Sequence, residues 1–77
     1  MWWLLPPKPM PPREVVSRLE RLGFRRVSQR GSHLKLRRES GGRTYTVVVP
    51  MHRKDLVVSV LGRILQQAGL EWQEFCP

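Results

Sequence analysis

The sequence predicts an α+β domain of the order αβββα, in which both helices cover one face of a three-stranded antiparallel sheet. Three observations predict it: a helical pattern after a run of prolines, an alternating block followed by a glycine pair and a β-branched run, and a second helical pattern. The chain has 77 residues, which is enough for one small hydrophobic core. Rossmann, barrel and multidomain architectures are therefore excluded.

The first twelve residues form a proline-rich segment, with five of the seven prolines between Pro6 and Pro12. Such a segment is extended and cannot join a helix or a central strand. We therefore expect residues 1–12 to be a tail outside the core, with Trp2 and Trp3 at a frayed terminus, and residues 13–77 to form one domain. The short apolar run lacks the basic start and the cleavage site of a signal peptide.

Two helices are predicted from apolar residues at helical spacing. The first spans about residues 12–22, with Pro12 in its first turn and Gly23 at its end. The second is closed by Gly69, and its apolar stripe consists of Val57, Val60, Leu61, Ile64, Leu65 and Ala68. After it, residues 70–75 are expected to form a terminal turn in which Trp72 and Phe75 dock on the core.

Three strands are expected between the helices. Residues 24–30 form a weak one that Gly31 interrupts, and residues 44–49 form a β-branched one that ends at Pro50. Residues 39–42 supply the glycines of a tight reversal. Residues 32–38 alternate strictly, which directs Leu34 and Leu36 to one face and places on the other His33, Lys35 and Arg37.

The leucine face of this sheet has to be covered, whereas the charged face can stay in water. Both helices are therefore expected on the leucine side, with the His33 side open to solvent. An αβββα layer of this size is the arrangement of double-stranded-RNA-binding-like domains, although a fold alone assigns no function.

Positive charge is concentrated in the first half of the chain. Of 14 Lys and Arg against 6 Asp and Glu, a net of +8, residues 13–43 carry ten cations and three Glu, a net of +7. This excess favours an anionic partner, and nucleic acid over a merely basic surface. The candidate electrostatic footprint, which would hold a backbone without reading sequence, comprises Arg21, Arg25, Arg26, Arg30, Lys35, Arg37, Arg38 and Arg43.

Cys76 is the only cysteine, so an internal disulfide or a cysteine metal cluster is impossible, and a cytoplasmic protein is expected. Two histidines without a cysteine pair, or a carboxylate at ligand spacing, make a poor zinc site. We expect no metal, no small-molecule cofactor and no membrane association.

Four stretches of the chain resemble the HicA (YcfA-like) family: residues 13–24, 29–35, 48–52 and 63–70. The most specific parts are Gly31-Ser32-His33 and the string from Ile64 to Leu70. HicA proteins are the toxins of HicA–HicB toxin–antitoxin pairs. The resemblance implies a double-stranded-RNA-binding-like fold, metal-independent cleavage of mRNA, a catalytic histidine at His33, and neutralisation by a HicB-type antitoxin, which we expect to be acidic.

Metal-free RNA cleavage needs a base for the ribose 2′-hydroxyl, positive charge for the phosphorane and an acid for the leaving oxygen. Imidazole suits the proton transfers because its ordinary pKa is near 6.5. The leading hypothesis therefore makes His33 the catalytic base or acid. The residues expected to contact RNA or its phosphates are Lys35, Arg37, Arg30, Ser32 and His52.

Two other functions fit the same residues. A non-catalytic RNA-binding module would use the basic face without cleaving, and a protein-interaction module would use it for an acidic partner only. For His52, in the loop after Pro50, a structural or phosphate-contact role is favoured over catalysis. No Ser-His-acid relay is visible, so Ser32 is not proposed as a nucleophile.

Overall fold

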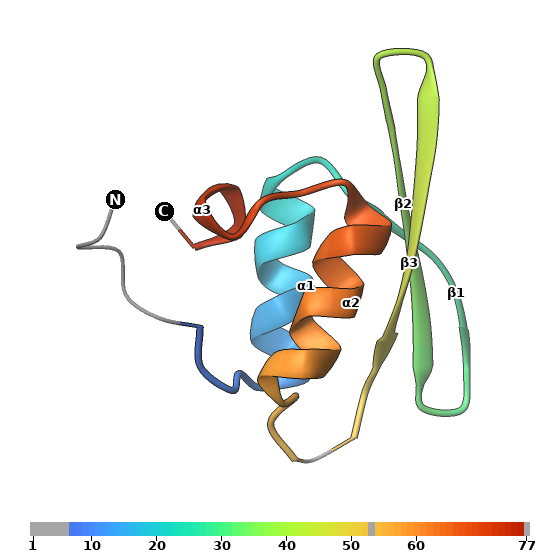
Figure 1. Cartoon of the computed structure of the whole chain (residues 1–77). Coiled ribbons are helices and arrows are strands. Elements are labelled where there is room, and N and C mark those ends of the chain that lie inside the picture. Colours follow the sequence, from blue (N-terminus) through green and yellow to red (C-terminus); the bar gives the residue numbers. More distant parts are fainter. Residues whose placement is uncertain (1–6, 53, 77) are drawn as a thin grey trace.

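The elements follow one another in the predicted order, and the predicted terminal turn forms a short third helix (Figure 1). The structure is a computed structural model, and its description covers residues 7–52 and 54–76. The elements are α1 Pro12–Arg21, β1 Arg25–Arg30, β2 His33–Ser40, β3 Arg43–Pro50, α2 Val58–Ala68 and α3 Trp72–Phe75. The α+β class with its αβββα layout is confirmed. Trp2 and Trp3 lie outside the described residues.

The sheet is antiparallel with the order β1-β2-β3, and two-residue turns join its strands. Gly41 and Gly42 both have positive φ, 60° and 77°, as a type I′ turn requires. In the other turn Gly31 has φ 56° and Ser32 follows it, the pattern of a type II′ turn. β1 pairs only with the first part of β2, so the tip of the β2–β3 hairpin projects beyond the helices (Figure 1).

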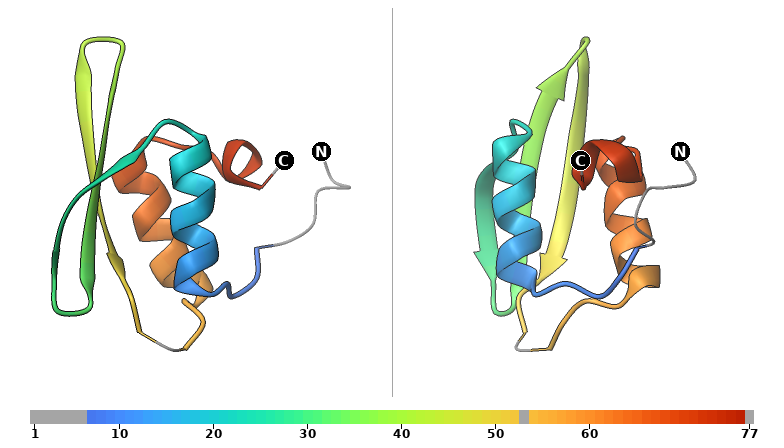
Figure 2. Two further views of the ribbon diagram at one scale, coloured as in Figure 1. Left: turned by 180° about the vertical axis from the view of Figure 1, so that it is seen from behind. Right: turned by 90° about the vertical axis from the view of Figure 1, so that its left-hand side faces the viewer.

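The helices form a layer on one face of the sheet. In the right-hand view of Figure 2, α1 lies over the side of β1 and β2, and α2 lies on the side of β3 and beyond it. Alternate strand residues face this layer and close the core by burying apolar surface. The buried residues shared between the two layers include Val15, Val16, Leu19, Leu34, Leu36, Val47, Val49, Leu61, Ile64 and Ala68.

Gly69 ends α2 as predicted, and it is needed there for two reasons. Its φ of 68° lies in the left-handed region that side chains disfavour. A Cβ at this position would also come within 2.5 Å of Cε1 of Tyr45, on β3. The absence of a side chain therefore lets the end of α2 pack directly against the sheet.

The C-terminal segment docks on the core, as the sequence predicts. Phe75 is buried, Trp72 is half-buried, and their ring centroids lie 6.0 Å apart. Arg18 of α1 donates from Nη1 to the carbonyl of Phe75 at 3.2 Å, and its guanidinium lies 5.7 Å from the ring centroid of Phe75. This arginine therefore joins α1 to α3, which explains why it is only half-exposed.

The expectation that the proline-rich segment lies outside the core is wrong for its last residues. Met10 is buried and forms an isolated bridge with Leu56, in which each backbone N–H donates to the other residue's carbonyl, at 3.1 and 2.7 Å. Pro12, in the first turn of α1, is buried as well. The segment before α1 is thus tied to the loop that leads into α2, a long-range contact that a local sequence pattern does not reveal.

Candidate functional site

The face of the sheet turned away from the helices, here called the open face, carries the candidate residues. On β2 the predicted alternation is confirmed: Leu34 and Leu36 are buried on the helix side, and His33 is exposed on the other. Lys35 and Arg37 share the open face with His33 and are half-buried. That is usual for long cationic side chains, whose stems lie along their neighbours while the charged group reaches water.

β1 adds two arginines to this face. In the register of the antiparallel pair, Arg30 lies directly opposite His33, and Arg25 directly opposite Arg37. Residues directly opposite in neighbouring strands point to the same face. The open face therefore gathers five side chains that can carry positive charge, here called the cation cluster: Arg25, Arg30, His33, Lys35 and Arg37.

A β-bulge makes this arrangement possible. Arg25 and Arg30 are five residues apart, so in a regular strand they would point to opposite faces. The register shifts between Arg26 and Ser28, which leaves Val27 as the extra residue. The bulge thus brings both arginines to the side of His33.

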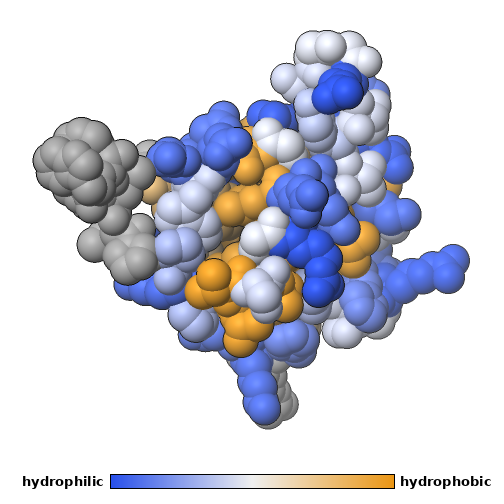
Figure 3. Space-filling view, in the orientation of Figure 1, coloured by the Kyte–Doolittle hydropathy of each residue, from blue (hydrophilic) through white to orange (hydrophobic). Residues whose placement is uncertain are grey.

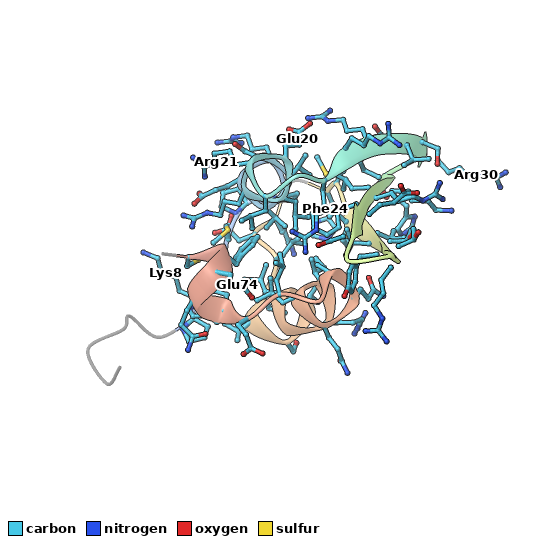
Figure 4. The ribbon with its side chains drawn as sticks, turned by 90° about the horizontal axis from the view of Figure 1, so that it is seen from above. Lys8, Glu20, Arg21, Phe24, Arg30 and Glu74 are labelled. Atoms are coloured by element: carbon cyan, nitrogen blue, oxygen red, sulfur yellow. The ribbon has the colours of Figure 1, made fainter. Side chains whose placement is uncertain are left out.

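The turn between β1 and β2 positions Arg30, Ser32 and His33 close to one another. Arg30 and His33 flank the two turn residues, and Gln29 closes the turn by donating from Nε2 to the carbonyl of Gly31 at 3.0 Å. Seen from above, Arg30 points outward from the sheet, away from both helices (Figure 4). Ser32 is exposed, and its carbonyl accepts a hydrogen bond from the backbone N–H of Met51.

His52 belongs to the same end of the sheet, although 19 positions separate it from His33 in the chain. Pro50 pairs with His33, Met51 bonds to Ser32, and His52 follows as an exposed residue. Met51 packs against the core and so anchors the start of this loop. The fold therefore brings the two histidines to the same end of the sheet, which the sequence left undecided.

Two arginines of the predicted footprint are engaged elsewhere. Arg38 shares the helix side of β2 with Leu34 and Leu36, donates from Nη1 to the carbonyl of Leu22 at 3.0 Å, and stacks over Phe24. Arg38 therefore does not belong to the open face, and the alternation already indicates this, since residue 38 points to the same side as Leu34 and Leu36. Arg26 donates from Nε to Glu20 at 3.1 Å in an exposed ion pair.

The open face is rich in hydrophilic side chains. In Figure 3 hydrophilic side chains project on the side where the sheet lies, whereas the hydrophobic colour gathers over the start of α2, where Val57 and Val58 are exposed. Within residues 7–52 and 54–76, no hydrogen-bonded partner orients the imidazole of His33, and no three His, Cys, Asp or Glu side chains come together as metal ligands. A site of this kind suits a long, flexible anion better than an enclosed small molecule.

We compared the sequence with models of known protein families. The model described as HicA toxin of bacterial toxin-antitoxin matches residues 12–70, from the start of α1 to the residue after Gly69. The chain belongs to the HicA toxin family. No curated protein matches it significantly. The resemblance seen in the four sequence stretches is thereby confirmed.

Family membership gives the function in outline. A HicA toxin is one member of a toxin–antitoxin system, which implies an antitoxin as partner. None of the helices in the described part of the chain is long and apolar enough to cross a membrane. The roles of His33, Lys35, Arg37, Arg30, Ser32 and His52 stay predictions at this point, although all six lie at the open face or its edge.

Proposed function

We propose that this HicA protein is a metal-independent endoribonuclease that cleaves mRNA and is neutralised by an acidic antitoxin of the HicB type. The observation that carries the proposal is the position of His33. It is the exposed imidazole of the open face, with Arg30 directly opposite and Lys35 and Arg37 in the same row. An imidazole can transfer the protons and neighbouring cations can stabilise the phosphorane, which are the protein groups that RNA cleavage without a metal requires.

In this mechanism the substrate supplies its own nucleophile. The imidazole of His33 takes the proton of a ribose 2′-hydroxyl, and the 2′-oxygen attacks the adjacent phosphorus. The P–O bond to the 5′-oxygen of the next nucleotide breaks, and that oxygen takes a proton from water, to which the imidazolium of His33 returns its own proton. The products are a 2′,3′-cyclic phosphate and a 5′-hydroxyl. General base catalysis of this type contributes about 10²- to 10⁴-fold to a rate.

The neighbouring cations have separate roles. Arg30 and Lys35 flank His33 and would stabilise the extra charge of the phosphorane, because guanidinium and ammonium groups donate to phosphate oxygens. Arg37, one step further along β2, would hold the next phosphate of the strand. Ser32 and His52, at the edge of the open face, would contact the RNA backbone on the other side of His33.

The decisive experiment uses the protein freed of its antitoxin, with RNA and EDTA present throughout. We expect wild-type protein to produce fragments ending in a cyclic phosphate, and His33→Ala to lose cleavage by at least about 10². His33 is exposed, so its replacement should leave the unfolding transition unchanged. The matched control is His52→Ala, which should weaken RNA binding and retain cleavage. Equal cleavage by His33→Ala and wild type would remove the histidine from the mechanism.

One observation favours a second function. The cation cluster on one exposed sheet face would equally serve a module that binds RNA through its phosphates without cleaving it. That module would retain RNA in a salt-sensitive way, with a wild-type protein that leaves the RNA intact. A protein-interaction module would bind an acidic partner and retain no RNA at all. The cleavage assay identifies the nuclease, and a measurement of RNA retention by the wild-type protein separates the other two functions.

A further inference from the structure

The two outer edges of the sheet differ in a way that matters for binding. β1 forms one edge, and it is bulged at Val27 and rich in arginine, two features that discourage the pairing of another strand. β3 forms the other edge. From Thr44 to Pro50 it carries no charged residue, and its register with β2 is regular throughout. Only β3 therefore offers a regular, uncharged edge.

The backbone groups available on β3 follow from the register. Hydrogen bonds in an antiparallel pair alternate along the strands. Met51 donates to Ser32, so this pair is hydrogen-bonded, and the odd-numbered residues of β3 bond to β2. Thr44, Thr46 and Val48 consequently direct their N–H and C=O groups away from the sheet.

The structure leaves this edge uncovered. Thr44, Thr46 and Val48 are all exposed, and among the described residues β3 pairs with β2 alone. The right-hand view of Figure 2 also shows the helix layer extending past β3, because α2 lies beyond that strand. A further strand along β3 would thus have α2 on its inner side and the open face on its outer side.

We propose that the outer edge of β3 is a docking site for an acidic β-strand of the antitoxin, which joins the sheet as its fourth strand. The identity of the partner rests on the proposed function. The availability of the β3 edge for a further strand follows from the sheet alone. Main-chain hydrogen bonds to Thr44, Thr46 and Val48 would give affinity, and alternate side chains of the added strand would give specificity.

Charge on the open face selects an acidic strand. Thr46 lies directly opposite Arg37, and Val48 directly opposite Lys35, on that face. These two short side chains are all that would separate the two cations from a carboxylate on the added strand, about 10 Å away at the usual spacing of strands. Aspartate and glutamate side chains of the partner can therefore meet the cations above Thr46 and Val48.

The same charge argues against a second copy of this chain as the occupant. Each chain carries +8, and an antiparallel pairing of two β3 strands would place the two open faces side by side. Like charges brought together in an interface cost several kcal/mol. An acidic strand would instead bring negative charge next to the positive open face, which is favourable.

The direct test measures amide exchange in the wild-type chain by NMR. The probe is a synthetic hexapeptide that alternates glutamate and valine, and its control alternates lysine and valine. We expect the glutamate peptide alone to slow exchange at the amides of Thr44, Thr46 and Val48, by about tenfold at ten times its Kd, because only unbound molecules exchange. The amides of Val47 and Val49, already bonded to β2, should change little.

Three results would overturn the proposal. One is unchanged exchange at the three outward amides with a saturating peptide, and another is an equal effect of the lysine peptide. The third is protection that grows with protein concentration before any peptide is added, which would show pairing between copies of the chain. None of these measurements depends on a variant that has to fold.

Two proline variants test the β3 edge, because each removes one outward backbone N–H from one edge of the sheet. Thr46→Pro removes an outward N–H and no bond to β2, a position where strands tolerate proline. Gln29→Pro removes the equivalent outward N–H from the β1 edge, since Arg30 and Ser28 are the residues paired through hydrogen bonds to β2. We expect Thr46→Pro to weaken binding of the glutamate peptide at least tenfold and Gln29→Pro to leave it unchanged.

These tests and the cleavage assay can fail independently. Peptide binding is measured without RNA, and RNA cleavage by the free protein is measured without peptide. Thr46→Pro should cleave RNA like wild type, because Thr46 has no part in the proposed chemistry. A protein that binds the peptide but leaves RNA intact would contradict the proposed nuclease and keep the strand-addition site. A protein that cleaves RNA and does not bind the peptide would support the proposed nuclease and contradict the strand-addition site.

Discussion

The two faces of strand β2 differ in burial and in chemistry. Leu34 and Leu36 point toward the helices and are buried, whereas His33, Lys35 and Arg37, which alternate with them, point to the open face. The buried set holds the layers together by excluding water, and the open set contributes little packing. We therefore expect substitutions at neighbouring residues of one strand to affect folding in one case and, if the proposed function is right, RNA in the other.

The largest effect is expected from the buried face. Leu36 is fully buried, and Leu36→Ala should lower the free energy of unfolding by about 2–5 kcal/mol, measured by urea denaturation. That is a large share of the roughly 5–15 kcal/mol that stabilises a domain. The matched control is Lys35→Ala, next to it on the open face, which should stay within about 0.5 kcal/mol of wild type. Similar losses in both variants would show that the faces are not separate.

The neighbours Arg37 and Arg38 sharpen the comparison, because they are chemically identical and face opposite sides. Arg38 stacks over Phe24 and Tyr45, with its guanidinium carbon 5.1 and 5.7 Å from the ring centroids, and it donates to the carbonyl of Leu22. We expect Arg38→Ala to cost about 1–3 kcal/mol of stability, through the lost hydrogen bond and cation–π contacts. RNA affinity, measured on the variant while folded, should not change.

Arg37→Ala should behave in the opposite way. Its stability should match wild type, and its RNA affinity should fall, with the slope of log K against log salt reduced by about one because one phosphate contact is lost. Binding titrations at several salt concentrations measure both quantities. An unchanged salt slope in Arg37→Ala, or a reduced one in Arg38→Ala, would show that the wrong arginine has been placed at the RNA.

The smallest effect concerns the helix layer above the buried face. Gly62 lies within α2, and a Cβ there would meet no atom within 4 Å. Gly62→Ala should therefore raise the unfolding free energy by about 0.5–1 kcal/mol, since alanine favours the helix and restricts the unfolded chain. Gly69→Ala is the control with the opposite sign, because of its positive φ and the nearby Tyr45. Thermal unfolding of the two variants, in opposite directions, checks the packing of α2 on β3.

Much of the fold could be predicted because its signals are local. The apolar stripe of each helix, the alternation around His33 and the glycine pair at 41–42 depend on residues near one another in the chain, and the structure agrees with each. Arg38 belongs to the same alternation as Leu34 and Leu36, so its position on the helix side of β2 follows from that local signal as well.

The remaining features depend on contacts between distant parts of the chain. The pairing of Arg25 with Arg37 requires the strand register, the bridge of Met10 to Leu56 joins segments 46 positions apart, and the position of His52 at the same end of the sheet as His33 follows from the end of β3. Free energies of such contacts depend on the assembled sheet, and a single sequence shows no pattern for them.

Because of the bulge at Val27, the face to which each arginine of β1 points depends on the number of residues in the strand. Strand residues alternate between faces, so deleting one residue from the bulge would exchange inside and outside for every residue on one side of the deletion. An insertion elsewhere in the strand would do the same. In most surface segments a change of one residue is absorbed by a loop. Here it would turn an arginine from the open face of the sheet to the helix side while leaving the composition, the charge and the element order of the protein almost the same.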